Sequence, residues 1–127
     1  SSEAFLHVSY LGSIPYQEIK SYINDATVCV FPTFAETFGM VTIEAMALQK
    51  PIVASNIGWA TEVIDDNVNG FLEHPKNHKQ FADKILRILS NLELQNQLGV
   101  EKRKKVESHF SIEIITMKSI EFYKKFV

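Results

Sequence analysis

Short apolar runs alternate with helical segments along this chain. The apolar runs cover residues 6–11, 28–31, 52–55 and 70–72, and several of their side chains are β-branched. Such runs, bounded by proline, glycine or polar residues, are typical of buried strands. Strands that alternate with helices in this way form an open parallel sheet with helices on its faces. The pattern therefore predicts an α/β fold.

The helical segments have recognisable starts and stops. Residues 15–25 carry apolar side chains on one face, and Pro15 fits the first turn. A second helix is expected over residues 41–48, with Thr37 as its N-cap. After Pro75 the chain is helical, and its apolar faces are expected to lie in a core or an interface. The apolar positions of the last segment are Ile112, Ile115, Phe122 and Phe126.

The most informative stretch places two carboxylates, Glu36 and Glu44, on either side of Gly39. The backbone N–H groups of Gly39, Met40 and Val41 are expected at a helix N-terminus, where they lack intrahelical partners and the helix dipole favours an anion. The two carboxylates bracket that position and can accept hydrogen bonds from sugar hydroxyls. This stretch therefore predicts a site for a phosphorylated sugar.

The two glutamates resemble the E-x7-E motif in the C-terminal nucleotide-binding domain of retaining, group 1 glycosyltransferases of the GT-B architecture. Other stretches match motifs of that family in the same order, which is more specific than the glutamate pair alone. They are residues 8–12, 26–32, 45–47, 51–55, 58–63, 69–72 and 110–123. The resemblance covers nearly the whole chain and implies a partial Rossmann-like GT-B domain.

The resemblance also implies a role for each residue of the stretch. It assigns the ribose hydroxyls of the nucleotide to Glu44, and the hydroxyls of the donor sugar to Glu36, the implied catalytic residue. The diphosphate and sugar would bind beside the remaining substrate-binding residues, Phe38, Gly39, Met40 and Val41. The implied mechanism uses no metal and no cofactor, because backbone amides stabilise the charge on the departing diphosphate.

Two positions depart from the family pattern. The helix that ends near Gln49 lacks the glycine that the family usually has there, so we expect no left-handed glycine cap. In the Gly58-Trp59 turn, a possible part of the donor site, the family often has a second glycine in place of Trp59. The indole either stacks on a base or sugar of the ligand or packs against the sheet.

Length and composition favour one domain. With 127 residues, 46% of them hydrophobic, the chain has enough apolar material for a single core over residues 1–127. Nothing in it matches the acceptor domain of the family or the Arg/Lys pair that reaches the diphosphate. We therefore expect a fragment that holds the donor-binding half of the enzyme and transfers no sugar alone.

Several classes of site and location are disfavoured. Cys29 is the single cysteine, so no disulfide framework exists, and we expect a cytoplasmic protein. His74 and His78 are four positions apart, but Pro75 between them disfavours a helix that presents both to a metal. No interleaving of basic and aromatic residues suggests nucleic-acid binding.

A basic run gives the chain an uneven charge distribution. Residues 100–127 hold seven basic and four acidic side chains, whereas the whole chain has a net charge of -2. The run either forms a solvated helix face or contacts an anionic membrane surface. Its residues are Lys102, Arg103, Lys104 and Lys105.

Together these features predict the donor-binding domain of a retaining glycosyltransferase that moves a sugar from a nucleoside diphosphate to a hydroxyl acceptor. Assembly of polysaccharide or glycolipid is the commonest setting for such enzymes. Two alternatives remain open: a non-catalytic subunit that binds sugar nucleotides, and a sugar-nucleotide epimerase of the same architecture.

Overall fold

The computed structural model describes residues 3–126 and contains a parallel sheet of three strands. The strands are β1 (Cys29–Phe31), β2 (Ile52–Ser55) and β3 (Phe71–Glu73), in the spatial order β1-β2-β3. Cys29 pairs with Ile52, and Val53 pairs with Phe71. All four residues of β2 are buried because this strand lies in the middle of the sheet. The predicted α/β fold is confirmed, and three of the four predicted strands are present.

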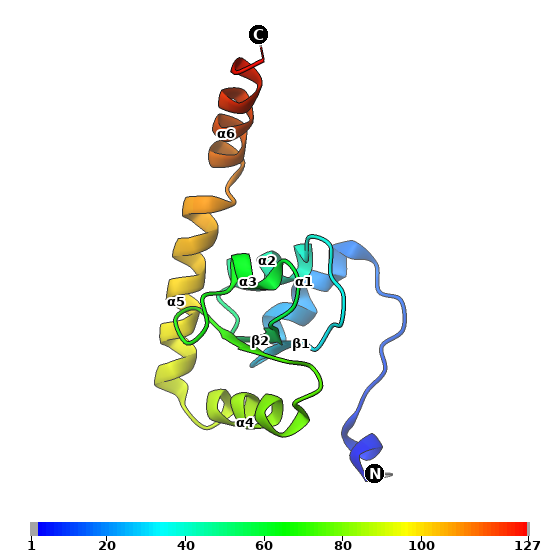
Figure 1. Cartoon of the computed structure of the whole chain (residues 1–127). Coiled ribbons are helices and arrows are strands. Elements are labelled where there is room, and N and C mark those ends of the chain that lie inside the picture. The colour runs from blue at the N-terminus through cyan, green and yellow to red at the C-terminus, as the bar shows by residue number, and fades with distance from the viewer. Residues whose placement is uncertain (1–2, 127) are drawn as a thin grey trace.

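Helices cover both faces of this sheet (Figure 1). On one face lie α1 (Tyr16–Asp25), α2 (Met40–Ala47) and α3 (Ala60–Val63), and on the other lies α4 (His78–Leu89). Side chains of β2 alternate between the two faces. Ile52 and Ala54 pack in one apolar cluster with residues of α2, whereas Val53 packs with Phe81 and Ile88 of α4 in a second cluster. The core is therefore built in two layers around the central strand.

The predicted strand over residues 6–11 is wrong. A short 3-10 helix spans Ala4–His7, and the residues after it are irregular. Val8, Tyr10 and Leu11 are exposed. An isolated strand cannot satisfy its backbone hydrogen bonds, and within residues 3–126 no strand lies beside the outer edge of β1. The apolar run therefore lies outside the sheet and leaves the outer edge of β1 unpaired within the described residues.

The start of α2 also differs from the prediction. Gly39 is the N-cap, in the left-handed conformation with φ of 62°, and no side chain caps the helix. Thr37 is thus not the N-cap. Glycine suits this position because other residues are strained at positive φ. Since the helix begins at Met40, Glu44 lies about one turn into it.

At its other end, α2 closes with a left-handed residue that is not glycine. The N–H of Gln49 donates to the Met46 carbonyl, and the N–H of Lys50 donates to the Ala45 carbonyl, both at 2.9 Å. This is the Schellman pattern, with Gln49 at φ 59° where glycine is usual. The expected glycine is indeed missing, but the left-handed turn forms without it.

The helical region after Pro75 is three helices, α4, α5 (Leu92–His109) and α6 (Ile112–Lys124). α5 packs against the end of α2, and Gly99 allows this because a Cβ there would lie 2.6 Å from the Gln49 carbonyl oxygen. α6 continues beyond α5 and away from the sheet in Figure 1. No residue of α6 is buried, so its apolar positions do not join the core.

Candidate functional site

Three segments meet near the carboxyl end of the sheet. They are the loop that joins β1 to α2, the loop that joins β2 to α3, and the first turn of α1. Ligands of open α/β sheets bind at this edge. The predicted residues Glu36, Gly39 and Glu44 lie on the first of these loops and on the helix that follows it.

The N-terminus of α2 offers free hydrogen-bond donors. The N–H of Thr42 donates to the Gly39 carbonyl at 2.9 Å. In the described part of the chain, the N–H groups of Gly39, Met40 and Val41 donate to no protein acceptor. Free donors at the positive end of a helix dipole can hold an anionic group. The sequence thus placed the donors correctly, although the helix starts one residue earlier than predicted.

Glu36 lies directly beside this N-terminus. Its Oε1 accepts a hydrogen bond from the Thr37 N–H at 3.0 Å, and its Cγ would be 3.4 Å from a Cβ built on Gly39. The residue is exposed, so the carboxylate remains accessible to a ligand. Glu36 therefore lies beside the exposed Met40 and the half-buried Val41, whereas Gly39 is itself buried.

The turn after β2 packs onto the loop that holds Glu36. The rings of Phe38 and Trp59 stack with their centroids 4.3 Å apart, and Trp59 also contacts Phe110 edge to face. A Cβ on Gly58, which has φ of 62°, would lie 3.4 Å from the Glu36 carbonyl oxygen. Trp59 thus packs within the domain, against Phe38 and an apolar core cluster, and a stack on a ligand stays a prediction.

Glu44 has a partner that the sequence did not predict. The hydroxyl of Tyr16, at the start of α1, donates a hydrogen bond to Glu44 Oε1 at 2.8 Å. This hydrogen bond raises the pKa of the tyrosine, because the nearby carboxylate disfavours the phenolate. The two residues are 28 positions apart, so no local spacing in the sequence signals the contact.

A groove opens beside this pair between α1 and α2. Its volume is about 440 Å³, within the usual range for small-molecule sites. Tyr16 and Glu44 line it together with apolar and basic side chains, which include Ile19, Ile23, Lys20 and Arg103. A ligand hydroxyl can therefore reach the Glu44 carboxylate from the groove.

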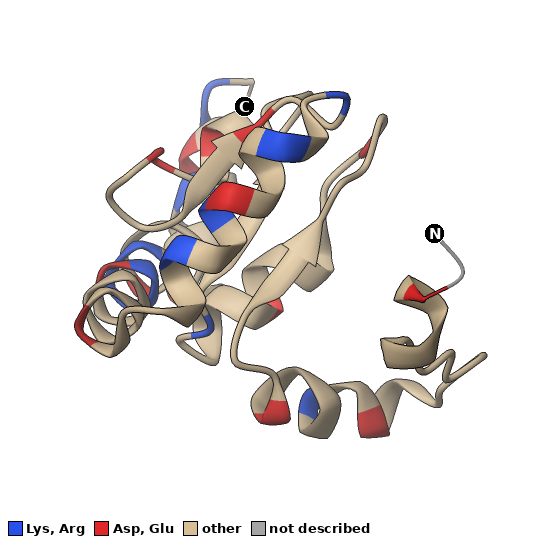
Figure 2. Ribbon diagram, turned by 90° about the horizontal axis from the view of Figure 1, so that it is seen from below, with Lys and Arg blue, Asp and Glu red and all other residues tan. Residues whose placement is uncertain are grey.

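The side chains of the basic run on α5 form hydrogen bonds or ion pairs with other residues of the domain. Lys102 is fully buried and donates to the Lys50 carbonyl at 2.9 Å, so both predicted alternatives, a solvated face and a membrane contact, are wrong for this residue. Burial lowers its pKa to about 7. Arg103, Lys104 and Lys105 each pair with a carboxylate, and a membrane contact through them stays a prediction. Figure 2 shows basic and acidic positions interspersed along the helices.

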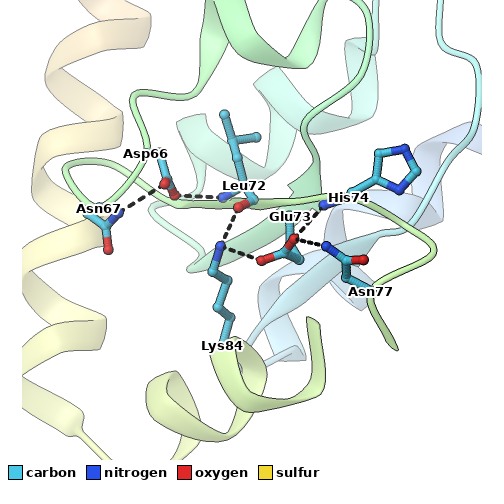
Figure 3. Close-up of polar contacts among 7 residues, drawn as sticks. All are labelled: Asp66, Asn67, Leu72, Glu73, His74, Asn77 and Lys84. Atoms are coloured by element: carbon cyan, nitrogen blue, oxygen red, sulfur yellow. Dashed lines mark hydrogen bonds and ion pairs between the residues drawn. The ribbon is translucent and has the colours of Figure 1, made fainter. Parts of the chain in front are cut away.

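A second polar cluster, also unpredicted, lies at the end of β3 (Figure 3). Glu73 accepts hydrogen bonds from Asn77 Nδ2 and the His74 N–H, both at 2.9 Å, and from Lys84 Nζ at 3.0 Å. The hydrogen bond from Asn77, followed by that from Lys84, lowers the Glu73 pKa to about 2. Both oxygens of the carboxylate thus accept hydrogen bonds within the protein, and the contact with Lys84 joins β3 to α4.

Residues 3–126 contain neither a cluster of metal ligands nor a helix that could span a membrane. No three side chains of His, Cys, Asp or Glu in that range come together as a metal site. None of the helices in that range has the length and apolar character needed to span a membrane.

The chain matches known proteins over most of its length. The family model described as glycosyl transferases group 1 matches residues 2–105. CapM of Staphylococcus aureus, a glycosyltransferase of capsular polysaccharide biosynthesis, is 35% identical over 107 residues, which are 84% of this chain and 28% of that protein. The chain spans about three tenths of the length of the curated relatives it matches.

Solved structures agree with the fold. Sucrose-phosphate synthase from Thermosynechococcus elongatus superposes with a TM-score of 0.85 at 30% identity, over 98% of this chain and 33% of that one. HepE of Anabaena, solved in complex with UDP-glucose, superposes with a TM-score of 0.76 at 25% identity, over 82% of this chain and 29% of that one.

Proposed function

Because the chain belongs to the group 1 glycosyltransferase family, we propose that it binds the nucleoside diphosphate sugar of a retaining transferase, which moves the sugar to a hydroxyl acceptor. The observation that carries the proposal is the free N-terminus of α2 beside two accessible carboxylates. HepE, a structural neighbour, was solved with UDP-glucose, a ligand of this class.

In this proposal the diphosphate lies against the amides of Gly39, Met40 and Val41. These donors are fixed by the helix and need no rearrangement when negative charge builds on the departing diphosphate. Gly39 permits this arrangement because it adopts the left-handed conformation, with φ of 62°, that starts the helix. The same donors therefore serve both in binding and in the reaction.

The two carboxylates bind the two parts of the ligand on either side of the diphosphate. Glu44 accepts hydrogen bonds from the ribose hydroxyls, and Glu36 orients the donor sugar for attack by the acceptor. A sugar held in the reacting geometry gains rate because less entropy is lost at the transition state. Since CapM acts in capsular polysaccharide biosynthesis, we place the acceptor among growing saccharide chains.

The test uses the intact protein and the Glu44→Gln variant, which keeps the side-chain shape and loses the charge. A thermal-shift comparison of UDP, GDP and ADP selects the nucleotide, and calorimetry then measures its affinity. We expect Glu44→Gln to weaken binding by about 1.5–3 kcal/mol, the range for hydrogen bonds to charged groups. The control, Glu121→Gln, changes an exposed glutamate on α6, remote from α2 in Figure 1. Equal affinities for wild type and Glu44→Gln would contradict the ribose role.

A further inference from the structure

Tyr16 is held at the site by one polar contact and little packing. Its side chain is 70% exposed, so burial does not fix the ring in place. Its hydroxyl donates to Glu44 Oε1 at 2.8 Å, across the groove between α1 and α2. A hydrogen bond to an ionised oxygen is stronger than one between neutral groups. The contact therefore acts mainly on Glu44 and only slightly on the stability of the fold.

We propose that Tyr16 is a positioning residue for the nucleoside, because its hydroxyl fixes the Glu44 carboxylate in the orientation that receives the ribose. This inference rests on the proposed function, in which Glu44 binds the ribose hydroxyls. An ionised carboxylate can accept about four hydrogen bonds through its two oxygens. One bond from Tyr16 therefore leaves enough acceptor capacity for both ribose hydroxyls.

The hydrogen bond from Tyr16 would reduce the conformational freedom that the Glu44 side chain loses when the ligand binds. A glutamate on an accessible helix surface samples several rotamers, and ordering it costs free energy that is subtracted from affinity. The hydrogen bond from Tyr16 holds the carboxylate before the ligand arrives. The opposite role, in which Tyr16 competes with the ribose for Glu44, predicts tighter binding when the hydroxyl is removed.

The direct test is Tyr16→Phe, which removes the hydroxyl alone. Calorimetry with the nucleoside diphosphate selected above should show affinity about three- to tenfold weaker, as expected for one hydrogen bond. The matched control is Tyr22→Phe, because Tyr22 lies on the same helix and its hydroxyl has no partner within residues 3–126. The control should bind with wild-type affinity.

Two further measurements separate positioning from a structural role. In the Glu44→Gln background, Tyr16→Phe should have at most a small effect, because both changes act through one carboxylate. The dideoxy analogue of the nucleotide, which lacks both ribose hydroxyls, should bind the wild type and Tyr16→Phe equally. A purely structural effect would reduce the affinity for both ligands alike.

The possible outcomes distinguish this inference from the proposed function. If Glu44→Gln weakens binding while Tyr16→Phe leaves it unchanged or strengthens it, the positioning role is overturned and the ribose role stands. A loss of equal size in the Glu44→Gln background would also overturn it. If Glu44→Gln has no effect, both proposals fail together.

Discussion

The ring of Trp59 stacks on the ring of Phe38, with the centroids 4.3 Å apart and the planes inclined by 27°. This contact joins the turn after β2 to the loop that carries Glu36. Cε3 of Trp59 would lie 3.5 Å from a Cβ built on Gly39. Trp59 thus packs against the loop at both Phe38 and Gly39.

Replacing Trp59 with Ala should therefore loosen the loop. We expect a loss of about 2–3 kcal/mol in unfolding free energy, below the range for fully buried aromatic residues because Trp59 is half-buried. Urea denaturation measures this loss. Trp59→Phe keeps an aromatic contact with Phe38 and should lose less. Equal stability of wild type and Trp59→Ala would show that the stack does not support the loop.

Gly99 should tolerate no side chain. A Cβ there would lie 2.6 Å from the Gln49 carbonyl oxygen, so α5 must move away from the end of α2. Alanine improves helix propensity by about 1 kcal/mol, but overpacking costs about 1–3 kcal/mol. We expect a net fall in the melting temperature, measured by circular dichroism. Val100→Ala, at an exposed neighbouring position, serves as the control. A higher melting temperature for Gly99→Ala would contradict the close packing.

Lys102 should make stability depend on pH near neutrality. Its pKa is about 7 in the folded protein and near 10.5 when unfolded, so the unfolded state binds more protons between these values. The free energy of unfolding should therefore rise as the pH increases from 7 to 8.5. Above about 9 the buried Cys29 thiol, whose pKa is raised by burial, opposes this trend.

The matched variant for this measurement is Lys102→Met, which keeps much of the side-chain volume and removes the titrating amine. Urea denaturation of both proteins at several pH values isolates the contribution of Lys102. The difference in stability between wild type and variant should shift in favour of the wild type as the pH rises. A difference that stays constant with pH would show that Lys102 is not the titrating group.

The sequence predicted the part of the fold that depends on local patterns. β2 is confirmed at residues 52–55, β1 begins one residue later than predicted, and β3 is displaced by one residue. The prediction for residues 6–11 is wrong because a strand must pair with a neighbour, and an apolar run does not show whether that pairing forms. The prediction of Thr37 as the N-cap is wrong because Gly39, in the left-handed conformation, is the N-cap and the helix begins at Met40.

In the candidate site, too, the sequence predicted the local features and missed the contacts that depend on packing. The free amides at Gly39 to Val41 follow from the strand, glycine and helix order, which is local. The sequence did not predict the hydrogen bond from Tyr16 to Glu44, because that contact depends on how α1 and α2 pack. The burial of Lys102 was also missed, since a run of four basic residues suggests a solvated face. Only the packing of α5 on α2 places it inside.

The central claim is that the two carboxylates recognise different parts of one ligand, and a pair of titrations with Glu36→Ala tests it most directly. Calorimetry on the intact protein would compare the selected nucleoside diphosphate with its glucose conjugate, for wild type and variant. We expect unchanged affinity for the free nucleotide and weaker binding of the nucleotide sugar, because the proposed function assigns the donor sugar, and not the nucleotide, to Glu36. Equal losses for both ligands, or no loss for either, would contradict the account.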